Sequence, residues 1–144
     1  MAPDEIAGFL RGREFMVVGT QLPGGWPHLT TVRYGWLGDR VAFQGYTKSQ
    51  KFVNLKRDPH VSALVEAPGD YDEIKGVLLL GVVHLQEDPD LVVEVMKSSL
   101  EQSPTALANT EVASLEAIAS KRTVATIEPE RVITWDHTRL GGRY

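Results

Sequence analysis

The sequence predicts a mainly β (α+β) fold, a six- to seven-stranded antiparallel barrel with flanking helices. Short segments of alternating or apolar residues, rich in Val, Ile, Thr and aromatic residues, recur along most of the chain and are typical of strands. Turn-forming Gly, Pro and Asp residues separate these segments, and only a few segments repeat apolar residues at helical spacing. At 144 residues, with no linker or repeat, the chain is expected to form a single domain.

A short helix, two strands and a hairpin are expected in the first third of the chain. An acidic residue opens the helix Asp4–Leu10, and apolar residues follow at helical spacing. The strands Glu14–Gln21 and His28–Leu37 are separated by the turn sequence LPGG. The short turn GDR then leads into a strand at Val41–Tyr46, so a β-hairpin is predicted here.

The rest of the chain alternates between strands and helices, and proline residues mark two of the boundaries. Asp88 followed by Pro89 is typical of a helix start. Pro129 is expected to form a turn between the last two strands. The predicted elements are, in chain order, the strand Val61–Ala67, the strand Gly76–Leu85, the helix Asp88–Gln102, the helix Asn109–Lys121, and the strands Arg122–Glu128 and Arg131–Asp136.

Positive charge gathers in one segment of an otherwise acidic chain. Six basic residues and one acidic residue lie between Arg33 and Arg57, whereas the whole chain has a net charge of −4. Ser49 is typical of a helix N-cap, and the Asp58-Pro59 pair ends the helix. Lys51 then falls in the first turn, where the helix dipole favours acidic residues instead. A hydroxyl, free backbone N–H groups and lysines at a helix start suit a phosphate group, with a solvated helical face as the alternative interpretation.

The composition argues against several classes of protein. A net charge of −4 does not fit a dedicated nucleic-acid binder, which needs a broad cationic face. No apolar run reaches the roughly 20 residues that span a bilayer, and no secretion signal is visible, so a cytoplasmic protein without a membrane partner is expected. The lack of cysteine excludes disulfides and thiolate ligands, and the four histidines have no metal-ligand spacing, so no metal site is expected.

Two motifs resemble a known family. The run S-x-K-x-x-N-L-x-R-D-P, from Ser49 to Pro59, follows the hairpin TVRYGWLGDRVAFQGY. Together they resemble the flavin and deazaflavin oxidoreductases of the split β-barrel superfamily, which includes pyridoxamine 5′-phosphate oxidase. The ending WDHTRLGGRY, Trp135–Tyr144, is similar to the C-terminus of members that use the deazaflavin coenzyme F420. The resemblance implies one split β-barrel domain over residues 1–144, and a homodimer with the cofactor at the subunit interface.

The resemblance also implies where the cofactor phosphate binds. Ser49 and Lys51 match the residues that hold the phosphate in this family. Tyr46 and Lys48 would line the channel between the phosphate and the ring system. All four residues belong to the cationic segment, so the resemblance and the charge pattern point to the same place.

Further residues are implied around the tricyclic ring of the cofactor. The strand that carries Thr31, Val32 and Arg33 would run beside the ring, with Arg33 directed toward the ring or the phosphate. Trp135 and Asp136 would cap the ring bound to the partner subunit. No catalytic side chain is predicted, because a redox cofactor supplies the reactivity itself.

The expected function is hydride transfer between reduced F420 and a small organic acceptor. The sequence lacks the R-x-H cluster and the R-x-x-L-L-K pattern of pyridoxamine phosphate oxidase proper, so oxidation of vitamin B6 is not expected. Three alternatives remain open. These are an FMN-dependent oxidase or reductase, a non-catalytic carrier of a flavin, deazaflavin or tetrapyrrole, and a regulator that only binds an anion.

Overall fold

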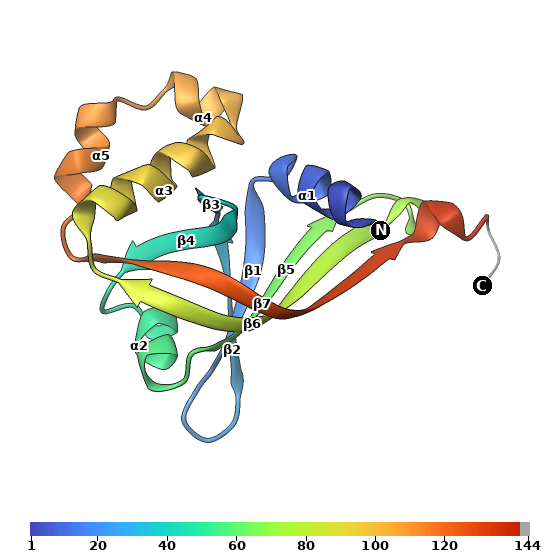
Figure 1. Ribbon diagram of the computed structural model, residues 1–144, viewed down its shortest axis with the longest axis horizontal. Helices are drawn as coiled ribbons and strands as arrows, with labels where there is room; N and C mark the ends of the chain where they lie inside the picture. Colours follow the sequence, from blue (N-terminus) through green and yellow to red (C-terminus); the bar gives the residue numbers. More distant parts are fainter. Residues whose placement is uncertain (142–144) are drawn as a thin grey trace.

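A single seven-stranded antiparallel sheet forms the centre of the protein, and it curls into a half-barrel (Figure 1). The computed structural model describes residues 1–141. The strand order is β2-β1-β5-β6-β7-β4-β3. The mainly β fold with flanking helices that the sequence predicts is therefore confirmed. The strands are β1 (Phe15–Gln21), β2 (Pro27–Arg33), β3 (Gly35–Leu37), β4 (Arg40–Tyr46), β5 (His60–Ala67), β6 (Lys75–Gln86) and β7 (Arg122–Asp136).

Five helices flank this sheet in three places. In Figure 1, α3, α4 and α5 lie together above one end of the sheet, α1 covers its other end, and α2 lies below. None of the helices formed by residues 1–141 is both long and apolar enough to cross a bilayer. The helices are α1 (Pro3–Arg11), α2 (Gln50–Arg57), α3 (Pro89–Glu101), α4 (Pro104–Ala108) and α5 (Val112–Ile118), with short helical turns at η1 (Tyr71–Glu73) and η2 (His137–Arg139).

A bend at Tyr34 divides the predicted strand His28–Leu37 into two. β2 pairs with β1 and β3 pairs with β4, so the two halves lie at opposite edges of the sheet. The Tyr34 side chain is fully buried, and its hydroxyl donates a hydrogen bond to the Leu10 carbonyl at the end of α1. The prediction of one continuous strand is therefore wrong, because burial of this aromatic ring redirects the backbone between the two edges.

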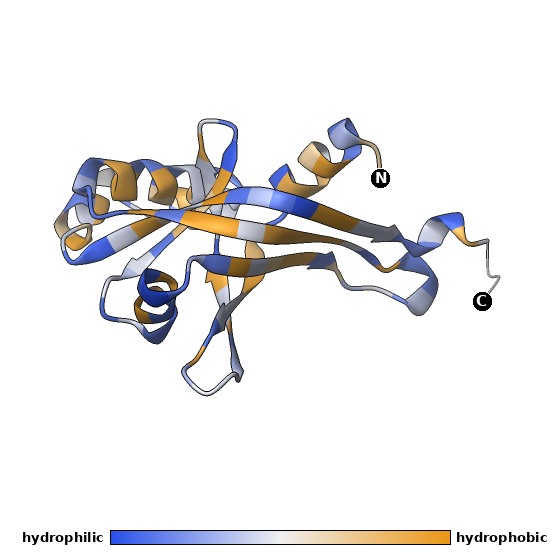
Figure 2. Ribbon diagram, turned by 60° about the horizontal axis from the view of Figure 1, so that its bottom comes forward, coloured by the Kyte–Doolittle hydropathy of each residue, from blue (hydrophilic) through white to orange (hydrophobic). Residues whose placement is uncertain are grey.

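Side chains alternate between two hydrophobic cores along β4. Phe43 points into the barrel, where it packs with Phe52 of α2, while Ala42 points outward against α3 and α5. Only one face of β1, β5 and β6 is buried in this way. Their outer face keeps a half-exposed apolar row, joined across the strands by register, that consists of Val17, Leu64, Leu78 and Ile133. Figure 2 shows hydrophobic stretches along the long strands in the middle of the molecule.

The last predicted pair of strands is a single strand of 15 residues, β7. Leu80 of β6 pairs with Arg131 and Gly81 pairs with Pro129, so Glu130 is an extra residue on β7. Such a bulge accommodates a proline, which cannot donate to the strand ladder. The prediction of a turn at Pro129 is therefore wrong, because pairing with the long strand β6 continues through the proline.

The other predicted elements agree with the structure, except for the predicted helix Asn109–Lys121. α1, α2 and α3 form where they are predicted, and the Asp88 carboxylate caps α3 by accepting a hydrogen bond of 2.9 Å from the Asp90 backbone. The predicted helix Asn109–Lys121 is shorter, and α4 precedes it. Leu115 is buried as its spacing requires, but Ile118 is 47% exposed at the end of α5.

Replacement of Gly81 by alanine is expected to destabilise the fold by about 2–3 kcal/mol. A Cβ at Gly81 would lie 2.1 Å from the Glu128 carbonyl oxygen, and this backbone atom cannot move without disturbing the bulge. The matched control is Gly8→Ala, since a Cβ at Gly8 meets nothing within 4 Å and alanine favours a helix by about 0.5–1 kcal/mol. Urea unfolding at a fixed protein concentration measures both changes. Equal stability of Gly81→Ala and the wild type would contradict the close backbone approach at the bulge.

Candidate cofactor-binding site

The joint between β4 and α2 leaves the start of the helix open to an anion. Ser49 is the N-cap, as predicted, with extended backbone angles (φ −67°, ψ 153°). Its backbone N–H and its hydroxyl both donate to the Tyr46 carbonyl, at 2.9 and 2.7 Å. The hydroxyl therefore does not cap the helix, and the first turn contains no acidic residue. The first backbone N–H groups of α2 and the positive end of its dipole remain available to a bound anion.

Lys51 is a half-buried cation that lies against β4. A Cβ at Gly45 would come within 3.4 Å of Lys51 Cε and 2.9 Å of the Phe52 ring, so glycine makes room for the lysine stem. Burial lowers the pKa of Lys51, and the positive charge of Arg122 lowers it further. Within residues 1–141, no carboxylate forms an ion pair with Lys51. A bound anion would relieve this uncompensated charge.

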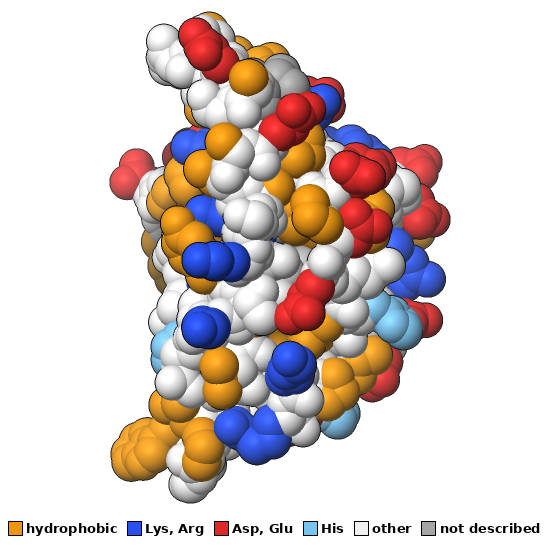
Figure 3. Space-filling model, turned by 90° about the vertical axis from the view of Figure 1, so that its left-hand side faces the viewer, with side chains coloured by type: hydrophobic (Ala, Val, Ile, Leu, Met, Phe, Trp, Pro, Cys, Tyr) orange, Lys and Arg blue, Asp and Glu red, His pale blue; other side chains and the backbone are white. Residues whose placement is uncertain are grey.

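Tyr46 and Lys48 complete the group of site residues at this joint. Both side chains are exposed, and the Arg122 guanidinium lies 4.1 Å from the centre of the Tyr46 ring. Figure 3 shows Lys and Arg side chains gathered on the lower half of the face that carries α2, with Asp and Glu more frequent above. The structure therefore brings four predicted residues together, Tyr46, Lys48, Ser49 and Lys51, and adds Arg122 to them.

Sequence reasoning missed Arg122. It is the first residue of β7 and pairs with Tyr46 across the ladder, but this register depends on the folded sheet. The signal that was present in the sequence is a basic pair, Lys121-Arg122, at the boundary between a predicted helix and a predicted strand. Without the pairing, nothing connects that pair to the cationic segment.

The three predicted residues on β2 point in different directions. Thr31 is exposed on the outer face of the sheet, and Val32 packs against the barrel core. Arg33 donates a hydrogen bond of 3.1 Å to Glu14 and lies over the Phe15 ring at 4.7 Å. It stands at the end of β2 away from α2, because α2 contacts the other end of β1. The cofactor-binding roles of these three residues stay predictions.

The inner face of β2 carries two polar atoms without partners. His28 Nδ1 and Thr30 Oγ1 are buried and have no hydrogen bond within the part of the chain that the structure describes. His28 lies opposite Thr20 in the β1–β2 register, and Thr20 accepts a hydrogen bond of 3.1 Å from Asn54 of α2. The two atoms therefore lie on the side of the sheet that α2 covers. β2 is also an edge strand, so its free edge is open to polar groups of a ligand.

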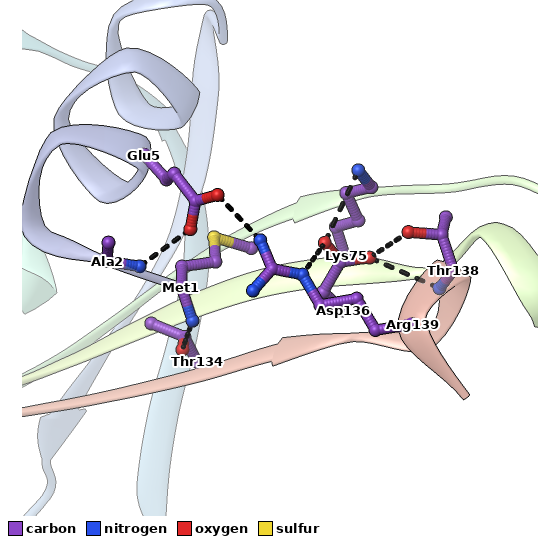
Figure 4. Close-up of polar contacts among 8 residues, drawn as sticks. All are labelled: Met1, Ala2, Glu5, Lys75, Thr134, Asp136, Thr138 and Arg139. Carbon is purple, nitrogen blue, oxygen red and sulfur yellow. Dashed lines mark hydrogen bonds and ion pairs between the residues drawn. The ribbon is translucent and has the colours of Figure 1, made fainter.

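Trp135 and Asp136 lie at the far end of β7, away from the joint between β4 and α2 (Figure 1). The Trp135 ring covers Gly76 so closely that a Cβ there would lie 2.1 Å from it. Asp136 holds the end of the sheet through Lys75 at 3.5 Å and Arg139 at 3.1 Å (Figure 4). One chain cannot bring these two residues to a cofactor at the joint. A role there requires a second subunit.

Two shallow hollows lie on the outer face of the sheet. The first has a volume of about 480 Å³ and includes Gly19, Leu29 and Ser62 in its lining. The second, of about 550 Å³, is lined by Thr31, Phe15 and other residues of β1 and β5. Lys51 lines neither hollow. The residues at the joint between β4 and α2 and these two hollows are therefore separate within one chain.

Comparison with known proteins agrees with the fold. The family model described as pyridoxamine 5′-phosphate oxidase matches residues 2–136. A conserved hypothetical protein of Mycobacterium tuberculosis, Rv2991, is 33% identical, with a TM-score of 0.87 over 100% of this chain and 90% of that one. A comparison with curated proteins finds none that matches.

More distant structures share the fold. A structure named F420 reductase is 22% identical, with a TM-score of 0.67 over 88% of this chain and 94% of the other. A FAD-binding protein of Mesorhizobium loti is 14% identical, with a TM-score of 0.67 over 93% and 94% of the two chains. The resemblance to the split β-barrel flavin and deazaflavin oxidoreductases is confirmed. The C-terminal motif is described only in part, because its last three residues, 142–144, lie outside the described residues.

Replacement of Lys51 by methionine is expected to stabilise the protein when no ligand is bound. Because the folded pKa of Lys51 lies below the unfolded value of 10.5, the folded state binds its proton less tightly, and the charged lysine destabilises the fold at neutral pH. Methionine retains the stem contacts, so a rise of about 1–3 °C in Tm is expected at pH 7. For the wild type, stability contributed by this group increases as the pH rises toward 10.5. Lys97→Met, on the exposed side of α3, is the control, and a lower Tm for Lys51→Met would refute the prediction.

Acid is expected to weaken the contacts at the end of β7. A hydrogen bond from Thr138, assisted by the charge of Lys75, lowers the pKa of Asp136. The stability from these contacts is therefore present above the unfolded value near 3.8 and is lost as the pH falls through the lower folded value. Thermal melts from pH 7 to strong acid should show Asp136→Asn less stable than the wild type at pH 7, with the difference shrinking in acid. Asp39→Asn, on an exposed turn, is the control, and a constant difference would contradict the model.

Proposed function

This chain belongs to the pyridoxamine 5′-phosphate oxidase family, and we propose that it is a homodimeric oxidoreductase that transfers a hydride between reduced F420 and a small organic acceptor. The observation that carries the proposal is the cation pair at the start of α2. Arg122 lies close enough to Lys51 for its positive charge to lower the pKa of the lysine, and no carboxylate within residues 1–141 pairs with either. Such a site fits the phosphate of a redox cofactor.

The residues at the joint would hold the cofactor rather than react. Lys51 and the first N–H groups of α2 would bind the phosphate, while Tyr46 and Lys48 flank the approach to it. The Ser49 hydroxyl would join them by turning away from the Tyr46 carbonyl, to which it donates in the unliganded chain. The free edge of β2 would lie along the ring, with His28 Nδ1 and Thr30 Oγ1 available to polar groups. The cofactor supplies hydride donation, and the chain supplies orientation and exclusion of water.

A second copy of the chain would complete the site. The outer face of the sheet exposes large apolar side chains, including Leu29 at 64% and Phe15 at 49%, beside the apolar row defined above. Exposed apolar surface of this kind favours association with another chain. In a two-fold dimer each chain would offer the same face to the other, which brings Trp135 of one chain toward the cofactor of the other.

Three observations favour F420 over FMN. The sequence lacks the two vitamin B6 patterns, its C-terminal motif resembles F420-dependent members, and one structure with this fold is named F420 reductase. Both cofactors present a phosphate, so the cation pair serves either one. An FMN-dependent enzyme and a non-catalytic carrier are the outcomes that compete with the proposal in the experiment below.

Charge reversal at Lys51 is expected to weaken F420 binding by about 10- to 100-fold, the range of a charge-assisted hydrogen bond. Fluorescence titration of the wild type, Lys51→Glu and the control Lys97→Glu measures the affinity for F420 and for FMN. Reduced F420 is then mixed with a panel of quinones and enones, and its oxidation is followed by absorbance. Tight binding of F420 without turnover would favour a carrier, and preference for FMN would favour the flavin enzyme. Unchanged binding by Lys51→Glu would overturn the proposed site.

A further inference from the structure

Two joints between secondary-structure elements lie side by side at this end of the sheet. One connects β4 to α2 and the other connects α5 to β7. The Thr47 backbone N–H donates to the Lys121 carbonyl at 2.9 Å, and the hydroxyl groups of Thr47 and Thr123 are 2.7 Å apart. Tyr46 and Arg122 are direct partners in the ladder. The cationic segment therefore has a second basic segment fixed against it.

Arg122 is held in one orientation by three contacts from two elements, α5 and β4. Its Nε–H donates to the Ile118 carbonyl at 3.0 Å, and its Nη1 donates to the Gln44 side chain at 2.9 Å. The guanidinium also lies over the Tyr46 ring at 4.1 Å. The two hydrogen bonds use two of the five N–H donors of an arginine, so three remain for a ligand. A planar guanidinium fixed in this way is suited to contact a phosphate through two parallel hydrogen bonds.

The charge of Arg122 has no compensation from the protein. Within the described residues no carboxylate lies within ion-pair distance of it, and its positive charge acts on another cation, Lys51, whose pKa it lowers. Two like charges held near each other repel, most strongly where one of them is partly desolvated. The hydrogen bonds of Arg122 to the Ile118 carbonyl and to the Gln44 side chain keep the guanidinium in place despite this repulsion. The repulsion between Arg122 and Lys51 therefore lowers the stability of the unliganded protein, and a bound anion would remove this repulsion.

The residue before Arg122 carries a further positive charge in an unfavourable backbone conformation. Lys121 has a φ of 62°, in the left-handed region that glycine adopts more easily. Its carbonyl accepts the hydrogen bond from Thr47, and its side chain is exposed. Lysine in this position places another cation beside the two joints. Its presence is consistent with an anionic ligand that extends past Arg122.

We propose that Arg122 is a second phosphate-binding residue of this site, fixed by Tyr46 and acting opposite Lys51. The inference rests on the proposed function for the identity of the ligand, a phosphate-bearing redox cofactor. The anion site itself follows from the cation pair. Two chain segments, the start of α2 and the start of β7, would then bind the phosphate. Only the start of α2 lies within the S-x-K-x-x-N-L-x-R-D-P motif.

Three arginine variants test this role. Arg122→Gln removes the charge, Arg122→Lys keeps the charge but loses the planar donor pair, and Arg11→Gln is the matched control. Arg11 also lies over an aromatic ring, that of Trp36 at 4.0 Å, but on α1. Calorimetry with inorganic pyrophosphate, followed by titration with F420 and FMN, gives the affinities. Arg122→Gln should weaken pyrophosphate and cofactor binding by at least about tenfold, Arg122→Lys by less, and Arg11→Gln should bind as the wild type does.

A measurement without cofactor separates this inference from the proposed function. The NMR titration of the Lys51 ammonium group in unliganded protein should show a higher pKa in Arg122→Gln, because the neighbouring positive charge is gone. If the wild type binds neither F420 nor FMN, the proposed function fails, and the pyrophosphate affinities still decide the role of Arg122. Pyrophosphate that binds equally to wild type and Arg122→Gln, or does not bind the wild type, would overturn the inference. Thermal melts confirm that each variant is folded.

Discussion

The buried side chain of Tyr34 determines how the sheet closes. Because its ring lies in the barrel core and its hydroxyl bonds to Leu10, the chain must leave the β1 edge and join β4 at the opposite edge. Two features of the site follow from this. β2 remains an edge strand with a free side, and β4 is aligned so that its last residue, Tyr46, meets the first residue of β7. The candidate cofactor site therefore depends on a tyrosine that does not line it.

Burial on both faces of β4 and of the first half of β7 explains where the cations gather. Phe43 faces the barrel core and Ala42 faces the helices, so charged side chains cannot stand in the middle of β4 or between Thr123 and Ile127 of β7. They emerge where the strands begin or end, at Tyr46–Lys51 and at Lys121–Arg122. β1, β5 and β6 are covered on one face only, and their outer side keeps exposed apolar residues. One half of the sheet thus carries cations at its end, and the other half carries an apolar surface.

Local signals in the sequence predicted the elements well, and they also predicted the hairpin of β3 and β4, but they carry no information on pairs that are distant in the sequence. Ser49 and the Asp58-Pro59 pair locate α2, because caps and proline act within a few residues. The bend at Tyr34 was missed, since hydrophobic alternation continues through it and only tertiary packing redirects the chain. The turn signal of Pro129 was overridden by the β6 ladder, which absorbs the proline in a bulge. Arg122 was missed for the same reason: its partner Tyr46 is distant in sequence and adjacent only in the folded sheet.

The residues of the proposed site lie at opposite ends of the sheet, and this separation constrains how two chains can form the proposed dimer. Within one chain, Lys51 and Trp135 belong to opposite ends of the sheet, and Asp136 is already engaged by Lys75 and Arg139. Of the two residues Trp135 and Asp136, Trp135 is therefore better placed to act on a partner, because its ring rests on Gly76 and forms no hydrogen bond within residues 1–141. A two-fold axis through the apolar outer face would place the far end of each chain at the cation pair of the other. Such a dimer holds two equivalent sites, and each one takes its phosphate contacts and its ring cover from different chains.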